Sequence, residues 1–142
     1  MTQSAQDLGR RWFGQVWNER RRDAIAEMLA PDAVLHEAGV DSVGPEGFYP
    51  FFDRMIASFS DLRVTVEETF GENDRVCIRW SFTAKHTGPG LGIDPTGRIA
   101  HATGISIIRV AGNLIVEGWQ NWDMLGMIEQ IKCTARSPAY IG

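Results

Sequence analysis

Cysteine is scarce in this sequence, and long hydrophobic runs are absent. Cys77 and Cys133 stand alone, without the C-x-x-C spacing of zinc and redox motifs, which is typical of a strand residue and a tail residue in a reducing compartment. No apolar run approaches the roughly 18–20 residues that span a bilayer, and the N-terminal segment lacks the apolar core of a signal peptide. We therefore expect a cytoplasmic protein that does not enter a membrane.

Basic residues are also fewer than acidic residues. Lys and Arg number 14 against 18 Asp and Glu, which gives a net charge of −4, so we expect no general nucleic-acid partner. The one basic cluster, Arg20 to Arg22, is typical of a solvated helix end. The 142 residues contain no repeat and fit one domain, residues 1–142, with a core over about 5–131 and a tail over 132–142.

The first half of the chain predicts helices and the second half predicts strands. Apolar residues at helical spacing indicate helices over 5–18, 23–30 and 45–59, with a short strand over 33–37 and a loop over 39–44. From residue 61 the period becomes two, and strands are expected over 61–70, 76–86, 98–110 and 114–122. This order favours an α+β fold. We expect a cone-shaped, curved antiparallel sheet wrapped around the N-terminal helices, with a central cavity.

Asp123 is the first candidate for chemistry. It follows Trp119 and Trp122 at the junction between the last strand and a short last helix. A carboxylate in poorly hydrated aromatic surroundings is suited to acid/base work near neutral pH. Asp is also a favoured N-cap, so Asp123 could simply begin the helix at Met124. Both roles stay open.

Three histidines, His36, His86 and His101, lie on separate predicted strands and could face the cavity. Their spacing is not that of a metal site, so we expect no metal. If residues 111–113 form a three-residue hairpin loop, His101 lies opposite Asp123; a two-residue loop shifts the register by one.

Further side chains are expected to line the pocket. Glu117 shares the parity of Asp123 and needs a partner if it points inward, for which Arg79 and Arg109 are candidates. An ion pair and a catalytic role are both possible for Glu117. The expected lining comprises six residues: His36, Phe52, Trp80, Phe82, Glu117 and Trp119.

Four stretches, residues 17–37, 44–68, 85–98 and 112–131, carry a family resemblance. The combination of H-T-G (86–88) with P-T-G (95–97), followed by E-x-W-x-x-x-D (117–123), is the most specific part. On these motifs the chain resembles the SnoaL-like polyketide cyclases, which have the nuclear-transport-factor-like (cystatin-like) cone fold.

The resemblance implies a homodimer that binds an apolar, carbonyl-containing small molecule without metal or cofactor. It implies ring closure by intramolecular aldol condensation, with Asp123 as general acid/base. Glu117 and Trp119 match the other positions of that motif, and His86 matches the family's histidine. The catalytic set expected from motifs and register is Asp123, His101 and His86. The tail departs from the family pattern, in which the last helix often finishes near Q-L-G.

Two other functions stay open. One is a non-catalytic, dimeric module that binds a small molecule, because this scaffold hosts many functions. The other is an epoxide hydrolase on the same scaffold. That chemistry needs two carboxylates bridged by an arginine, and the close Asp-x-Arg spacing expected for it is absent.

Overall fold

The computed structural model describes residues 4–37 and 39–132, so the expected tail lies largely outside the described residues. Its helices are α1 (Ala5–Trp12), the π-helix η1 (Phe13–Asn18), α2 (Arg22–Met28), α3 (Gly44–Ser58) and α4 (Met124–Lys132). Its strands are β1 (Leu29–Glu37), β2 (Val40–Val43), β3 (Phe59–Glu72), β4 (Arg75–His86), β5 (Ile99–Ala111) and β6 (Leu114–Trp122).

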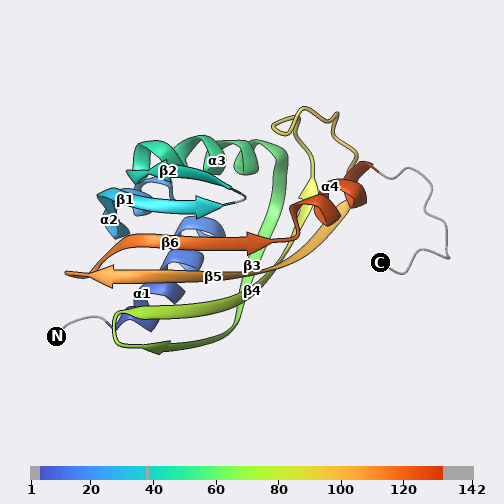
Figure 1. Ribbon diagram of the computed structural model, residues 1–142. Helices are drawn as coiled ribbons and strands as arrows, with labels where there is room; N and C mark the ends of the chain where they lie inside the picture. The colour runs from blue at the N-terminus through green and yellow to red at the C-terminus, as the bar shows by residue number, and fades with distance from the viewer. Residues whose placement is uncertain (1–3, 38, 133–142) are drawn as a thin grey trace.

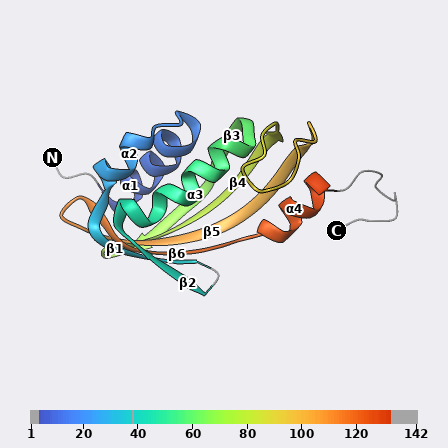
Figure 2. The same ribbon diagram turned by 90° about the horizontal axis from the view of Figure 1, so that it is seen from above.

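The helices cover one face of a curved sheet, which confirms the expected α+β class (Figures 1 and 2). The strand order is β2-β1-β6-β5-β4-β3, and the sheet is open. In Figure 2, α1, α2 and α3 lie on one side of the strands, and α4 follows the end of β6. None of the helices in the described residues has the length and apolar character needed to cross a membrane.

The sheet is mixed rather than wholly antiparallel. β1 pairs with β6 in parallel, while the other four pairings are antiparallel. Sequence periodicity places residues on faces but does not choose a strand's neighbour, so this pairing of distant segments was beyond the sequence prediction.

The first expected helix, 5–18, is divided. Ser4 caps α1 by accepting a hydrogen bond from the Asp7 N–H (3.0 Å), and the chain continues as the π-helix η1 without a break. Because a π-turn shifts the angular position of every later residue, it changes which side chains face the sheet. Leu8, Val16 and Trp17 are all buried there.

The hairpin between β5 and β6 has a two-residue loop. Ala111 pairs with Leu114, and both loop residues, Gly112 and Asn113, have positive φ, as tight hairpin turns require. A register shift follows between Arg109 and Val110. The three-residue loop that would set His101 opposite Asp123 is therefore not formed.

Alternation along β4 and β5 separates a helix-covered face from an outer face. Val76, Ile78, Trp80 and Phe82 are buried under the helices. The helix-covered face is packed so closely that a Cβ on Gly104 would lie 2.3 Å from the Trp80 ring. On the outer face, by contrast, Ile105 and Ile107 are 49% and 38% exposed.

Candidate active site

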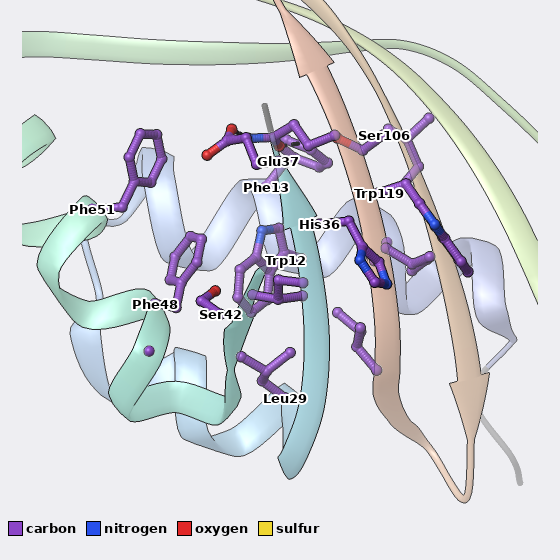
Figure 3. Close-up of a pocket in the computed structure, with 18 residues that line it drawn as sticks. Trp12, Phe13, Leu29, His36, Glu37, Ser42, Phe48, Phe51, Ser106 and Trp119 are labelled. Atoms are coloured by element: carbon purple, nitrogen blue, oxygen red, sulfur yellow. Dashed lines mark hydrogen bonds between the residues drawn. The ribbon is translucent and has the colours of Figure 1, made fainter. Parts of the chain in front are cut away.

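An aromatic pocket lies between the helices and the helix-covered face of the sheet. Its walls include Trp12, Phe13, Phe48 and Phe51, with aliphatic side chains from β4, β5 and β6 beneath them (Figure 3). The cavity volume is about 100 Å³. A second, smaller apolar cavity shares Phe13, Phe51 and Gln120 with the first and extends towards Trp80, Phe82 and Trp122.

The size of the pocket bears on its occupant. Ligand sites for drug-sized molecules enclose roughly 300–1,000 Å³. The main cavity is smaller than this, and aromatic rings such as Phe51 border both cavities. A polycyclic or long-chain ligand would therefore have to displace side chains and join the two spaces.

A strip of hydrogen-bonded polar groups crosses the otherwise apolar wall. Trp80 Nε1–H donates to Ser106 Oγ (3.0 Å), and the Ser106 hydroxyl donates to Gln120 Oε1 (3.1 Å). Gln120 Nε2–H donates to Glu37 Oε2 (2.5 Å), and Trp122 Nε1–H donates to the same oxygen (2.9 Å). The strip runs across β4, β5, β6 and β1, and it ends on a carboxylate in the pocket wall.

Sequence reasoning did not select Glu37 as a site residue. A signal was nevertheless present, because the alternation over 33–37 places Glu37 on the same face as Leu35, a core residue. A carboxylate on the apolar face of a strand needs hydrogen-bond donors. The donors are Gln120 and Trp122, which only the pairing of β1 with β6 brings close.

A second polar cluster surrounds His36 on the outer face. His36 Nδ1 lies 2.8 Å from Asp41 Oδ1, and Nε2 lies 2.9 Å from Glu117 Oε2. Arg109 donates to the other oxygen of Glu117 (3.2 and 3.3 Å), so one of the two candidate arginines pairs with Glu117, while the other, Arg79, pairs with Glu68. Figure 3 shows the His36 and Trp119 rings stacked on the side of β1 away from Phe48 and Phe51.

The charged and polar groups of this cluster are paired with one another. Hydrogen bonds to Glu117 and Asp41 raise the pKa of His36, which favours an imidazolium that donates from both ring nitrogens. The hydrogen bonds from His36 and then Arg109 lower the pKa of Glu117. Every strong donor and acceptor at its centre is paired, which is typical of a structural network.

Asp123 caps α4. Its Oδ1 accepts a hydrogen bond from the Gly126 N–H (2.9 Å), and its own N–H donates to the Thr103 carbonyl (3.2 Å). The residue is exposed and borders a shallow groove with Thr103, Ile105 and Ile107 on the outer face. Thr103, rather than His101, lies beside it.

His86 and His101 occupy opposite environments. His86 is fully buried; its Nδ1 accepts from the Thr96 N–H (3.2 Å), which leaves the proton on Nε2, and Nε2 has no partner among the described residues. His101 is exposed, and its backbone exchanges two hydrogen bonds with the Gln130 side chain.

The remaining predicted pocket residues divide between the two faces. Trp80 and Phe82 border the second cavity, and Phe52 is buried against Trp17 in the helix layer. Trp119 borders the main pocket but stacks on His36, while Glu117 belongs to the outer cluster. In the described part of the chain, no group of three His, Cys, Asp or Glu side chains has the geometry of a metal site.

Comparison with known proteins finds solved structures with the same architecture. The chain is 26% identical to IdmH from Streptomyces antibioticus, a provisionally assigned polyketide cyclase, with a TM-score of 0.81 over 92% of this chain and 100% of IdmH. It is 26% identical to TsrD from Streptomyces laurentii, with a TM-score of 0.78 over 91% and 95% of the two chains. A SnoaL-like protein from Jannaschia, 22% identical over 92% and 93%, shares the fold with a TM-score of 0.83.

No protein of curated function matches the sequence. The sequence profile of the SnoaL-like polyketide cyclases, in contrast, matches residues 8–131, which is most of the chain. The fold found here, a curved sheet with helices on one face, is the fold of the solved neighbours. The chain therefore belongs to the SnoaL-like polyketide cyclase family.

Proposed function

We propose that this protein is a cofactor-free cyclase or isomerase that acts on an apolar small molecule containing carbonyl groups. The observation that carries the proposal is a hydrogen-bonded carboxylate in an aromatic pocket, within a fold of the SnoaL-like cyclase family. Aromatic walls suit a planar, conjugated substrate, and a carboxylate supplies the proton acceptor that carbon-acid chemistry requires.

The proposed reaction is an intramolecular aldol closure. A carboxylate removes a proton from a carbon next to a carbonyl, the resulting enolate attacks a second carbonyl of the same molecule, and the new alkoxide takes a proton. Conjugation in the substrate spreads the enolate charge. General acid/base help contributes roughly 10²–10⁴-fold, and alignment of the two reacting carbons in a shaped pocket contributes further.

Asp123 is the residue to which the family resemblance gives the acid/base role, and that role stays a prediction. Asn is as good an N-cap as Asp, so Asp123→Asn removes the titratable group and retains the α4 cap. The variant therefore separates chemistry from folding.

One observation favours a second function, that of a non-catalytic binding module. The Asp123 carboxylate caps α4 on the exposed side of the sheet. If no carboxylate reaches the substrate, the aromatic pocket would bind a small molecule without changing it.

We further propose that the protein pairs with a second copy through the outer face. Ile105 and Ile107 lie side by side on β5, half-exposed, with the partly exposed Cys77 and Trp119 on the neighbouring strands. A second copy that covers this apolar strip would bury it in a self-complementary contact, which is the usual form of a twofold interface.

The catalytic proposal is tested by proton–deuterium exchange at the α-carbons of β-keto esters and polyketide-like ketones, followed by NMR. We expect wild-type protein to accelerate exchange above the rate in buffer and above the rate with an unrelated protein. Absence of exchange with a ketone that demonstrably quenches tryptophan fluorescence would favour the binding module. Loss of exchange in Asp123→Asn, with folding intact, would assign the base to Asp123.

A further inference from the structure

We propose that Glu37 is a catalytic carboxylate of the pocket, and that its free oxygen Oε1 takes and returns the substrate proton. This inference deepens the proposed function and rests on it. It adds a residue that the family motif E-x-W-x-x-x-D does not contain, on a strand far from that motif in the sequence.

The two oxygens of the Glu37 carboxylate have different surroundings. Gln120 and Trp122 both donate to Oε2, at 2.5 and 2.9 Å. Within residues 4–37 and 39–132, no donor reaches Oε1. A carboxylate fixed through one oxygen, with the other unoccupied, is pre-organised to accept a proton from a bound molecule.

The carboxylate of Glu117 differs from that of Glu37. Both oxygens of Glu117 are held, one by His36 and one by Arg109. The donors to Glu37 are instead a neutral amide and a neutral indole, and no cation of the described residues is paired with it. Of these two carboxylates, only Glu37 combines a place in the pocket wall with an available oxygen.

The strip that ends on Glu37 has a fixed direction of hydrogen bonding. Trp80 has only a donor, so the Ser106 oxygen must accept from it and the Ser106 hydrogen must point to Gln120 Oε1. The amide of Gln120 is then oriented with its NH₂ towards Glu37. Trp80 and Ser106 are 6% and 5% exposed, so water competes little for these bonds. Gln120, Trp122 and Ser106 are therefore positioning residues, and Glu37 is the group that touches substrate.

The proton and electron balance closes without a co-reactant. Glu37 Oε1 takes the α-proton, and the C–H electron pair forms the enolate. The enolate carbon forms a C–C bond with a second carbonyl carbon, whose π electrons pass to its oxygen. Protonated Glu37 returns the proton to that alkoxide, which gives a β-hydroxy ketone isomeric with the substrate and regenerates the carboxylate.

The substrate class follows from the surroundings of Oε1. The aromatic walls of Trp12, Phe48 and Phe51 offer few polar partners, so the substrate is apolar away from its reacting carbonyls. A carboxylate in this setting deprotonates most readily a carbon between two carbonyl groups. We therefore assign the site to 1,3-dicarbonyl compounds carrying a flat apolar or aromatic body.

The test compares wild type, Glu37→Gln and Glu129→Gln in α-carbon deuterium exchange of a β-keto ester. Gln can still accept at one oxygen from Gln120 and Trp122, which preserves the fold, and Glu129 is an exposed residue of α4 that takes no part in the strip. We expect a loss of at least 100-fold in Glu37→Gln and wild-type exchange in Glu129→Gln. Exchange in Glu37→Gln within threefold of wild type would overturn the assignment.

A binding measurement keeps this assignment distinct from the proposed function. The probe is 2-naphthol, a flat enol mimic whose hydroxyl would donate to Oε1, titrated against tryptophan fluorescence. If wild type shows no exchange, the catalytic proposal fails. In that case, naphthol binding weakened tenfold or more in Glu37→Gln alone would retain Glu37 as the polar anchor of the pocket. Equal binding in all three proteins would refute that role as well.

Discussion

Gly104 sits where β5 passes beneath two indole rings. A Cβ built at this position would lie 2.3 Å from the Trp80 ring and 2.7 Å from the Trp122 Cβ. Neither side chain can withdraw freely, because Trp80 and Trp122 hydrogen-bond Ser106 and Glu37 respectively. The residue is thus tied both to packing and to the polar strip of the pocket.

We predict that Gly104→Ala lowers the free energy of unfolding by about 1–3 kcal/mol, as overpacking a core usually does. Gly14→Ala is the matched control, because a Cβ built there meets nothing within 4 Å beyond its chain neighbours and the backbone of its own helix, and its φ is not positive. Alanine is favoured over glycine in helices, so this control should be neutral or slightly stabilising. Urea denaturation measures both, and equal stabilities for the two variants would contradict the packing described here.

The cluster around His36 predicts a pH window for its contribution to stability. The pKa of His36 is raised above its usual 6.5, so its contribution is complete below 6.5 and is lost as the pH rises through the folded-state value. The pKa of Glu117 is lowered from 4.5, so its contribution is complete above 4.5 and is lost as the pH falls through the folded-state value.

We therefore expect the stability difference between wild type and His36→Gln to be largest between pH 4.5 and 6.5. It should shrink above that window, as measured by chemical denaturation at a series of pH values. His101→Gln serves as the control, since its ring hydrogen-bonds nothing in the described part of the chain. A difference that stays constant from pH 5 to 9 would rule out a charged His36 network.

At the scale of the element, α4 depends on the capping residue that precedes it and on its buried face. Asp123 accepts from the Gly126 N–H, and Met127 and Ile131 are fully buried. The cap and the apolar face together attach a nine-residue helix that would not be stable in isolation.

We predict that Asp123→Ala lowers stability by about 1 kcal/mol through loss of the cap, whereas Asp123→Asn costs little. Urea denaturation gives the overall change, and hydrogen exchange of the α4 amides shows whether the loss is local. Equal destabilisation by Ala and Asn would mean that the charge of Asp123, rather than its capping hydrogen bond, stabilises the helix.

Elements that depend on the local sequence could be predicted, whereas elements that depend on tertiary packing could not. The strands β4, β5 and β6 are found within one residue of the expected ranges, since apolar and polar residues alternate with a period of two in each segment. β2 was expected as part of a loop, because four residues beside a glycine carry no periodic signal. The π-helix and the bulge at Arg109 were not predicted either, because tertiary packing and not local propensity places such features.

The same distinction holds for the candidate site. The cap at Asp123 and the Arg109–Glu117 pair were both foreseeable from sequence spacing. The polar strip was not, because it joins β1 to β6 through a parallel pairing that links residues more than 80 positions apart. His36 and Trp119, both expected in the pocket, do border it, but the His36 ring also hydrogen-bonds Glu117 on the side of β1 away from Phe48 and Phe51 (Figure 3).

At the scale of the whole molecule, the outer face of the sheet leaves Ile105 and Ile107 partly exposed on neighbouring positions of β5. We predict that wild-type protein is a dimer by sedimentation velocity, and that Ile105→Asp and Ile107→Asp shift it towards monomer, because a buried charge opposes association. Ile99→Asp is the control, since Ile99 is 61% exposed on the same strand but lies away from Ile105 and Ile107. A monomeric wild type, or equal effects from all three substitutions, would contradict the interface.

The central claim is that the aromatic pocket performs carbon-acid chemistry on a carbonyl compound. The most direct measurement is the rate of α-proton exchange of a β-keto ester in D₂O, followed by proton NMR with wild-type protein. The account predicts exchange well above the buffer rate, saturable with substrate and inhibited by 2-naphthol. A ketone that binds the pocket, quenches its tryptophans and exchanges no faster than in buffer would contradict the claim and leave a binding protein.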